Sequence, residues 1–390
     1  MKNLTIRPLF CLASLCMVPA VLRAEPPGLL EFRAGAGVEH HTNVLQRATQ
    51  QQSDDIGVLA VGVKAEREYS LQHFKADVEA ATYRYRDQSH LDYSTLNYAA
   101  AWDWKFTPAL HGVLSAERRQ YRDITNIPAT GLDEVGRRTE RTELLEGIYD
   151  IDGVWRALAG VSRSSSSSTV PQSWDASPTV RSARVGGGYE WASGSSLFAR
   201  FRRGDGEYKA PVFPATSADF RENEADLQLR WIATGKTSLE ARLGHLRRTH
   251  SEAPARDFSG TVGSAIVNWA ATGKTKVVAG LLRDLSSSGL DIGGTVQSTR
   301  FYVGPVWNAT AHTAVSARYD RTERSWRDVP AGAPDTGRQD VIQAASIGVD
   351  WTPRRIVTVS ALVRGERVRS TISGVGFRNT VIGLGVKVAI

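Results

Sequence analysis

The chain has 390 residues, of which 41% are hydrophobic and 23% charged, with a formal net charge of +7. This positive excess is small for the length, so it does not predict a nucleic-acid partner. Both cysteines, Cys11 and Cys16, lie near the N-terminus. The rest of the chain therefore has neither a disulfide framework nor a cysteine metal site.

The first 24 residues have the pattern of a cleavable secretory signal peptide. Lys2 and Arg7 form a basic segment, Leu9–Val18 is an apolar core, and Ala24 is a small residue before the expected cleavage site. The apolar core is too short to cross a bilayer as a helix, and no later segment has the roughly 20 consecutive apolar residues that a transmembrane helix needs. We therefore expect an exported protein that is soluble in the periplasm, secreted, or a closed barrel.

Residues 25–390 are expected to form one domain, in which apolar and polar residues alternate with a period of two. This period is typical of β-strands that have one apolar and one polar face. Eighteen such runs occur in chain order, at about 29–40, 55–67, 71–86, 93–106, 110–122, 141–151, 154–164, 180–192, 196–207, 219–233, 237–248, 258–271, 275–285, 298–309, 313–324, 339–352, 356–369 and 377–390.

The connections between these runs alternate between short turns and long polar loops. Eight short turns and nine long loops join the eighteen runs, so we expect both ends of the chain to lie on the short-turn side of the barrel. Outer-membrane barrels alternate in this way, with short periplasmic turns and longer external loops. The fold class expected is an all-β, transmembrane, antiparallel up-and-down β-barrel of about 18 strands. A β-propeller also has repeats near 40 residues, but each repeat would need four short strands instead of two long ones.

A series of aromatic residues precedes the short turns at a nearly constant spacing. Trp191, Trp231, Trp269, Trp307 and Trp351 are separated by 40, 38, 38 and 44 residues, and Tyr149 and Trp104 extend the series backwards. Amphipathic aromatic rings are favoured where a membrane meets water. We expect these seven residues to form a girdle at the periplasmic interface.

Arginines on the polar face are the candidate contacts for a polysaccharide or a small polar solute in the lumen. They are Arg156, Arg184, Arg200, Arg202, Arg230, Arg242, Arg318 and Arg364. A guanidinium group can hold carboxylate or phosphate groups through two parallel hydrogen bonds. The alternative is that these arginines pair with acids on the same face and hold the wall together. Those acids are Asp103, Glu117, Glu190, Glu224, Asp226, Glu240, Asp320, Asp350 and Glu366.

Two further patterns predict partners in the outer membrane, besides its lipid. Arg203, Arg247, Arg321 and Arg367 continue the apolar face at the external ends of strands, where contact with lipopolysaccharide phosphates is one possible use and simple solvation the other. The run Gly385–Ile390 resembles the terminal strand signal read by the barrel assembly machinery, with Ile390 in place of the usual Phe.

No catalytic, cofactor-binding or metal-binding residue is expected. The pair His40–His41 is the one histidine cluster, and solvated loop histidines are the commoner reading of it. His111 and Ser115 share a strand face but are too far apart for direct contact between a nucleophile and its base. We therefore expect a protein that is not an enzyme.

The chain resembles the EpsL-like outer-membrane β-barrel proteins of exopolysaccharide gene clusters. The residues that carry the resemblance are the run Phe32–Val38, the segment Asn43-Val44-Leu45 with Arg47, the motif Tyr83-Arg84-Tyr85-Arg86, the aromatic run Tyr98–Trp104, and the repeated Trp-x-x-Thr-Gly-Lys-Thr turns at Trp231 and Trp269. The residue before Asn43 is Thr42, where the family has an acid. The resemblance implies export of an extracellular polysaccharide across the outer membrane of a Gram-negative bacterium, with a periplasmic partner protein completing the path.

Two functions fit these patterns. The first is a channel that takes part in polysaccharide export, and the second is a diffusion porin or a substrate-specific uptake channel with the same architecture. A long loop folded into the lumen would favour the second, because such a loop narrows the passage. An outer-membrane hydrolase is disfavoured, because no catalytic constellation is present.

Overall fold

The computed structural model describes residues 30–126, 133–169, 178–208, 219–251, 254, 257–286, 295–327 and 336–390. The predicted signal peptide, residues 1–24, lies outside the described residues. None of the helices in the described part is both long and apolar enough to cross a membrane.

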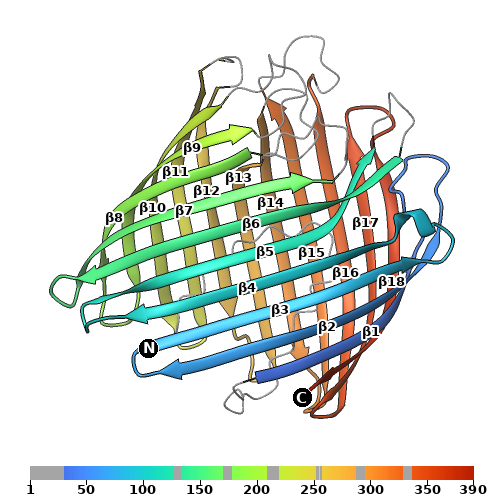
Figure 1. The fold of residues 1–390 in the computed structure, drawn as a ribbon, viewed down its shortest axis with the longest axis horizontal. Coiled ribbons are helices and arrows are strands. Elements are labelled where there is room, and N and C mark those ends of the chain that lie inside the picture. Colours follow the sequence, from blue (N-terminus) through green and yellow to red (C-terminus); the bar gives the residue numbers. More distant parts are fainter. Residues whose placement is uncertain are drawn as a thin grey trace.

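Eighteen antiparallel strands form a single closed sheet (Figure 1). β1 pairs with β2 along one edge and with β18 along the other, so the first and last strands close the barrel. The predicted fold class is therefore confirmed, including the number of strands. The strands are β1 (Leu30–His41), β2 (Asp54–Tyr69), β3 (Gln72–Tyr85), β4 (Tyr93–Lys105), β5 (Leu110–Asn126), β6 (Asp133–Asp150), β7 (Trp155–Ser168), β8 (Pro178–Glu190), β9 (Ser196–Tyr208), β10 (Phe220–Thr234), β11 (Thr237–His250), β12 (Phe258–Trp269), β13 (Thr275–Ser286), β14 (Thr295–Asn308), β15 (Thr313–Arg327), β16 (Gln339–Arg354), β17 (Val357–Ser370) and β18 (Phe377–Ala389).

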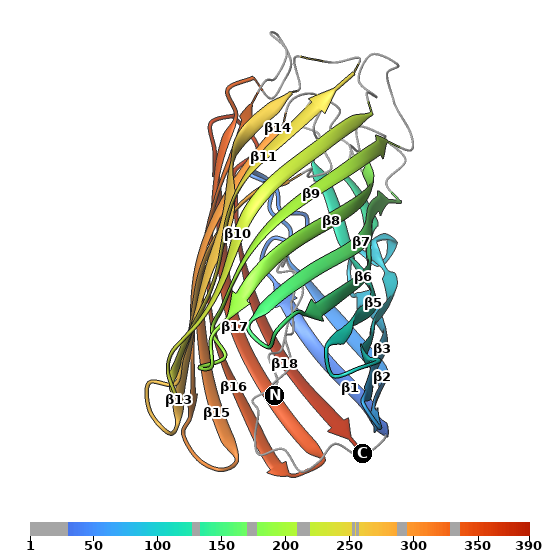
Figure 2. The same cartoon turned by 90° about the vertical axis from the view of Figure 1, so that its left-hand side faces the viewer.

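The strands are tilted across the barrel wall, and the short turns gather at the end of the barrel where β18 finishes (Figure 2). A 3₁₀ turn, η1 (Ser89–Leu91), lies in the connection between β3 and β4. The chain ends against the first strand, where the Ile390 backbone N–H donates to the Phe32 carbonyl (2.9 Å) and the Phe32 N–H donates to the Ile390 carbonyl (2.8 Å).

The short turns repeat one geometry, which explains the spacing of the tryptophans. The hydroxyl oxygens of Thr234, Thr272 and Thr310 each accept a hydrogen bond, at 3.1 Å, from the backbone N–H two residues later. Such a bond stabilises a tight turn locally. In the neighbouring strands Trp269 lies opposite Thr237, Trp307 opposite Thr275 and Trp351 opposite Thr313.

The two faces of the wall differ in polarity, as the alternation predicts. Ile347 is 61% exposed on the apolar face of β16, whereas its neighbours Ser346 and Gly348 lie on the opposite face. Outward apolar residues that are half or more exposed are what a barrel in lipid requires. Six residues of the expected girdle are on this face and are 43–51% exposed: Tyr149, Trp191, Trp231, Trp269, Trp307 and Trp351.

Trp104 departs from the other members of the girdle, because only 9% of it is exposed. Its indole ring lies flat over Gly112 and Gly147, whose missing side chains leave room for it, and the ring of Phe106 lies 4.8 Å away, centroid to centroid. The exposed aromatic rings of the series therefore run from Tyr149 to Trp351, and Trp104 packs against the wall instead.

Candidate functional site

The eight predicted lumen arginines lie on the polar face, and seven of them form ion pairs with acids among the described residues. The exception is Arg230, which faces Glu240 across the β10–β11 pair but has no ion-pair partner in the described strands. The seven paired residues are Arg156, Arg184, Arg200, Arg202, Arg242, Arg318 and Arg364.

The strongest grouping runs across β9, β10 and β11. The Arg202 guanidinium donates to Glu224 at 2.7 Å and to Glu222 at 3.1 Å. Arg242 donates to the other oxygen of Glu224 at 2.9 Å, and Arg248 donates to Glu222 at 2.6 Å. Each carboxylate is therefore shared by two guanidinium groups. Charge-assisted hydrogen bonds of this kind are stronger than neutral ones.

Two further pairs adjoin this group, one between β9 and β10 and one between β8 and β6. Arg200 donates to Asp226 through Nε (2.9 Å) and Nη2 (2.7 Å), and the Arg184 guanidinium lies 2.6 Å from the Glu146 carboxylate. The carboxylates of the ladder are almost completely covered, with side-chain exposures of 3–6%. We call Arg184, Arg200, Arg202, Arg242 and Arg248, with their acids Glu146, Glu222, Glu224 and Asp226, the lumen ladder.

Smaller groups hold the remaining arginines. Arg156 contacts Asp150 at 2.8 Å and also Glu190, next to the short turns. Arg364 reaches Glu366, on the same strand, at 3.3 Å.

Asp320 on β15 is shared by two arginines, as Glu222 and Glu224 are. Arg318 contacts it at 2.6 Å, and Arg300 also binds it, donating through Nε at 3.0 Å. The Arg318 guanidinium also lies over the Tyr302 ring, 4.6 Å from its centroid, which adds a cation–π contact.

This arrangement favours a structural role for most of the arginines. A guanidinium whose donors are already used by carboxylates cannot grip a passing solute without breaking an ion pair. Arg230 differs, because its guanidinium group is not engaged by an acid in the described part of the chain. The predicted use of the eight arginines as solute contacts stays a prediction, and Arg230 is the member for which the geometry leaves donors available.

Sequence reasoning missed Arg248, Glu222, Arg300 and Glu146. Arg248 lies on the same face as Arg242, six residues along β11, but Leu246 between them interrupts the polar pattern. Leu246 instead belongs to a buried apolar cluster with Phe258 and Val262. Parity alone could have identified these four residues, whereas their partners depend on the register between strands.

The connection 42–53 between β1 and β2 packs against the lumen side of the wall. Val44 and Leu45 are 1% and 3% exposed and form one apolar cluster with Ile56, Tyr85 and Leu91. Residues two apart in a strand share a face. The exposed apolar residues of these strands are Leu59 on β2 and Val78 on β3, and Ile56 and Tyr85 are each an odd number of residues away from them. Ile56 and Tyr85 therefore lie on the opposite, polar face. This long connection therefore folds back over the inner wall instead of standing free.

Polar contacts fix the same connection. The buried Asn43 side chain donates to the Arg47 carbonyl (2.8 Å) and the Arg378 carbonyl (2.9 Å), and its own carbonyl accepts from the Arg47 N–H (3.0 Å). Arg122 donates to the Val44 carbonyl at 2.7 Å, and its guanidinium lies 5.2 Å from the centre of the Tyr85 ring. The segment is thus held from β3, β5 and β18.

Asp92, which follows η1, anchors the neighbouring connection. Its carboxylate accepts from the Tyr85 backbone N–H (2.8 Å) and from Arg84 (3.0 Å). The Tyr85 N–H, supported by Arg84, holds the pKa of the Asp92 carboxyl below its ordinary value of 3.8.

We expect this anchor to weaken only in acid. A carboxyl whose pKa is lowered by folding contributes stability above its ordinary pKa, and that contribution is lost as the pH falls through the lowered value. Hydrogen exchange at the Tyr85 amide, corrected for the intrinsic rate, should therefore keep its protection down to about pH 4 and lose it below. The Asp92→Asn variant should lack this pH dependence; the same dependence in that variant would contradict the assignment.

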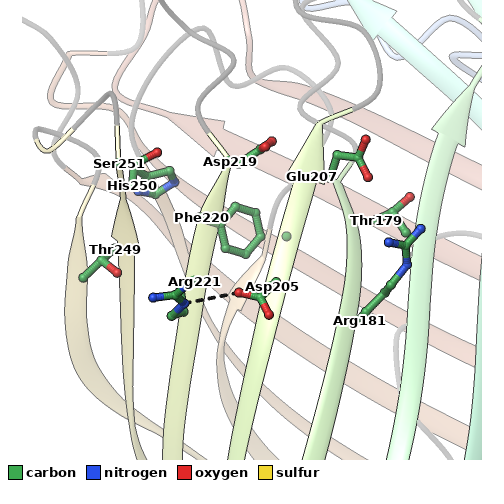
Figure 3. A pocket seen from close by; sticks show the side chains of 11 residues that line it. Thr179, Arg181, Asp205, Glu207, Asp219, Phe220, Arg221, Thr249, His250 and Ser251 are labelled. Atoms are coloured by element: carbon green, nitrogen blue, oxygen red, sulfur yellow. Dashed lines mark hydrogen bonds and ion pairs between the residues drawn. The ribbon is translucent and has the colours of Figure 1, made fainter.

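A pocket of about 520 Å³ lies at the rim formed by β8, β9, β10 and β11 (Figure 3). Arg181 and Arg221 line it together with the acids Asp205, Glu207 and Asp219, and Arg221 pairs with Asp205 at 3.2 Å. The charge of the pocket is mixed, and none of the eight predicted arginines contributes to it.

The histidines do not form a metal site in the described ranges. His40 bonds to Asp55 at 2.8 Å, and His41 bonds to Glu39 at 3.0 Å. Across the residues whose placement is described, no group of three or more potential ligands is arranged to hold a metal ion.

Three comparisons with known proteins bear on this barrel. A family model described as "Putative beta-barrel porin 2" matches residues 181–390. No curated protein sequence matches the chain. Among solved structures, OccK2 (OpdF) of Pseudomonas aeruginosa is similar at 14% identity with a TM-score of 0.50, over 93% of this chain and 97% of that one.

Other solved structures give the same picture. OccK2 in complex with glucuronate aligns at 12% identity and a TM-score of 0.50, over 93% of this chain and 96% of that one. The outer membrane protein OpdK of Pseudomonas aeruginosa aligns at 12% identity and a TM-score of 0.49, over 93% of this chain and 99% of that one. At these identities the likeness is one of fold.

Proposed function

Because the chain belongs to the "Putative beta-barrel porin 2" family, we propose that it is an outer-membrane channel that admits small polar solutes selectively. The chain is an outer-membrane β-barrel of the porin kind, and this family and fold are those of channels rather than enzymes. To this the proposal adds three properties: transport is inward, the solutes are small, and the channel selects among them. It also includes the cleavable signal peptide over residues 1–24.

The observation that carries the proposal is the connection 42–53. A segment packed on the inner wall reduces the cross-section available to a solute, and the diameter of a pore is one of the properties that set its selectivity. The apolar cluster around Val44 and the hydrogen bonds of Asn43 hold this segment in place. A polysaccharide chain in transit would instead need an unobstructed passage.

A small carboxylated solute is the class that best fits the charges. The lumen ladder has five arginines and four acids, so its net charge is slightly positive. Arg230 adds a guanidinium group without an ion-pair partner in the described strands. Planar guanidinium groups recognise carboxylates in preference to neutral sugars. Glucuronate, which is bound in one of the OccK2 structures, is a carboxylated sugar and therefore a suitable test molecule for this chain.

Polysaccharide export, the other expected function, rests on the resemblance to the EpsL-like proteins alone. No described feature of the wall favours a polymer over a small solute. Deletion of the gene with measurement of surface polysaccharide separates the two, because loss of the polymer would contradict the uptake proposal.

Purified protein in planar bilayers provides the direct test. We expect single-channel conductance with a preference for anions, and faster swelling of proteoliposomes in glucuronate than in glucose. Arg230→Gln should reduce the preference without changing the unfolding transition. Equal permeation of both solutes, in both proteins, would contradict selectivity through the arginines.

Loosening the connection 42–53 should increase conductance. Val44→Gly removes a fully buried side chain whose burial contributes about 1.5–3 kcal/mol, which corresponds to a roughly tenfold or larger shift toward the released segment. Gln51→Gly, in the same connection but exposed, is the matched control and should leave the conductance unchanged. Identical conductance in the two variants would show that the segment does not narrow the passage.

A further inference from the structure

A second set of arginines lies on the outer wall, away from the lumen. On strands β5 to β8, and again on β17 and β18, arginines have the parity of the exposed aliphatic residues. Three pairs lie directly opposite each other across neighbouring strands: Arg118 with Arg141, Arg163 with Arg181, and Arg367 with Arg378. We call these the outer arginine pairs.

The pairing of like charges is unfavourable unless something offsets it. Residues directly opposite each other in an antiparallel sheet have Cβ atoms about 5 Å apart, and like charges there destabilise the sheet. Arg163 has Glu143 at 3.9 Å, and Arg181 lies opposite Asp205 on β9, which itself pairs with Arg221 at 3.2 Å. In the described strands the other four, Arg118, Arg141, Arg367 and Arg378, form no ion pair with an acid. Almost every lumen arginine has an acidic partner, whereas most of the outer arginines face another arginine without one.

The position of the pairs along the wall indicates what offsets the repulsion. Arg141 precedes Tyr149 of the girdle by eight residues, and Arg181 precedes Tyr189 by eight. At about 3.3 Å per residue and a strand tilt near 40°, this separation is about 20 Å along the barrel axis. The apolar band of such barrels is about 25 Å tall. The outer arginine pairs therefore lie near the far edge of the band, toward the long-loop end.

Exposed aliphatic side chains lie on the same strand face as the paired arginines, two to four residues closer to the girdle. Val161 and Val185 are 55% and 57% exposed below Arg163 and Arg181, and Val363 and Ile382 are 51% and 49% exposed below Arg367 and Arg378. The surface thus combines an apolar strip with a doubly cationic head. Its complement is an amphiphile with several acyl chains and an anionic head that can bridge two guanidinium groups.

We propose that the outer arginine pairs bind the phosphate groups of a phosphorylated glycolipid in the outer leaflet, with its acyl chains on the aliphatic strip below. A phosphate has three acceptor oxygens and can take two hydrogen bonds from each guanidinium. One phosphate between two arginines replaces their repulsion with two attractions. Arg203 and Arg247, which flank Asn223 from both sides, are placed to extend the site around the wall.

The first experiment uses the unaltered protein in neutral detergent and varies the lipid. Purified lipid A with both phosphates is compared with its dephosphorylated form and with phosphatidylglycerol at equal phosphate concentration. We expect the bisphosphorylated lipid to raise the unfolding temperature most, because ligand binding to the folded state stabilises it. Equal stabilisation by the dephosphorylated lipid would overturn the proposal. Equal stabilisation by phosphatidylglycerol would also overturn it, because the arginines would then respond to any anionic lipid.

The second experiment tests the pairs themselves. Arg367→Gln with Arg378→Gln should weaken lipid A binding about tenfold, since each lost charge-assisted contact is worth on the order of a few-fold to tenfold. Lys387→Gln, which removes one charge from the opposite face of β18, is the control and should bind as the unaltered protein does.

The sign of the effect without lipid separates binding from a structural role. In neutral detergent the single variant Arg378→Gln removes a like-charge contact, so its unfolding temperature should equal or exceed that of the unaltered protein. With lipid A the order should reverse. A variant that is less stable under both conditions, or a double variant that binds lipid A normally, would overturn the proposal.

Discussion

Replacement of Ile347 by arginine is expected to prevent assembly of the barrel in a bilayer. Ile347 is 61% exposed on the outer face of β16 and lies four residues from Trp351, about halfway up the apolar band. An arginine at the midplane of such a barrel costs about 2–4 kcal/mol, a large share of the stability of an ordinary folded protein. The folded fraction after insertion into phospholipid vesicles, measured by heat-dependent gel mobility, should fall sharply.

The adjacent residue provides the matched control. Ser346 is on the lumen face of the same strand, so Ser346→Arg places the same side chain in water and should leave the folded fraction nearly unchanged. Leu229→Arg and Gln228→Arg on β10 form a second pair with the same expectation. Equal yields within each pair would mean that the two faces are not lipid and water.

Neutralising Glu224 should destabilise the wall by a comparable amount. Glu224 is shared by Arg202 and Arg242, and its side chain is 3% exposed. Glu224→Gln removes the charge that both guanidinium groups contact, leaving Arg242 without this partner and Arg202 with Glu222 alone. Removal of one member of a buried ion pair typically costs about 3–5 kcal/mol. Urea unfolding in phospholipid vesicles should report the loss.

Glu240 on β11 serves as the comparison, because it is exposed on the lumen face and has no ion pair among the described strands. Glu240→Gln should change the free energy of unfolding by no more than about 0.5 kcal/mol. The double variant Glu224→Gln with Arg242→Gln should lose less than the sum of the single losses, since contacting residues couple. Additive losses would argue against a shared network.

The sequence predicted the number of strands because every crossing needs one lipid face and one water face. That requirement imposes a period of two which is visible in a single chain, as in the run Leu96–Phe106. It disappears where a strand projects beyond the membrane and both faces meet water. The start of β6 shows this, since the structure begins the strand at Asp133, whereas the alternation predicted a start near residue 141. Arg137, Arg138, Thr139 and Glu140, at the start of this strand, put polar side chains on both faces.

The site was less predictable than the fold. The face of Arg202 or Arg242 follows from parity, but its partner follows from the register between β9, β10 and β11, which no local pattern encodes. The exposure of Trp104 depended on two glycines on other strands, Gly112 and Gly147. The packing of Val44 on the lumen wall likewise depends on contacts with β3 and β5, which lie far away in the sequence.

The pairing of β1 with β18 has a consequence for the timing of assembly. Arg33 lies opposite Ala389 in that pair, so the contact that seals the wall joins nearly the two ends of the chain. Closing a flexible loop costs entropy before any contact forms, although each doubling of its length adds only about 0.6 kcal/mol. Until β18 arrives, β1 and β17 both present unpaired backbone groups, which are templates for aggregation. The two edges stay open until the thirteen-residue strand β18 pairs with β1. We therefore expect the risk of aggregation to last until the barrel closes, and an unclosed chain to need separation from its neighbours.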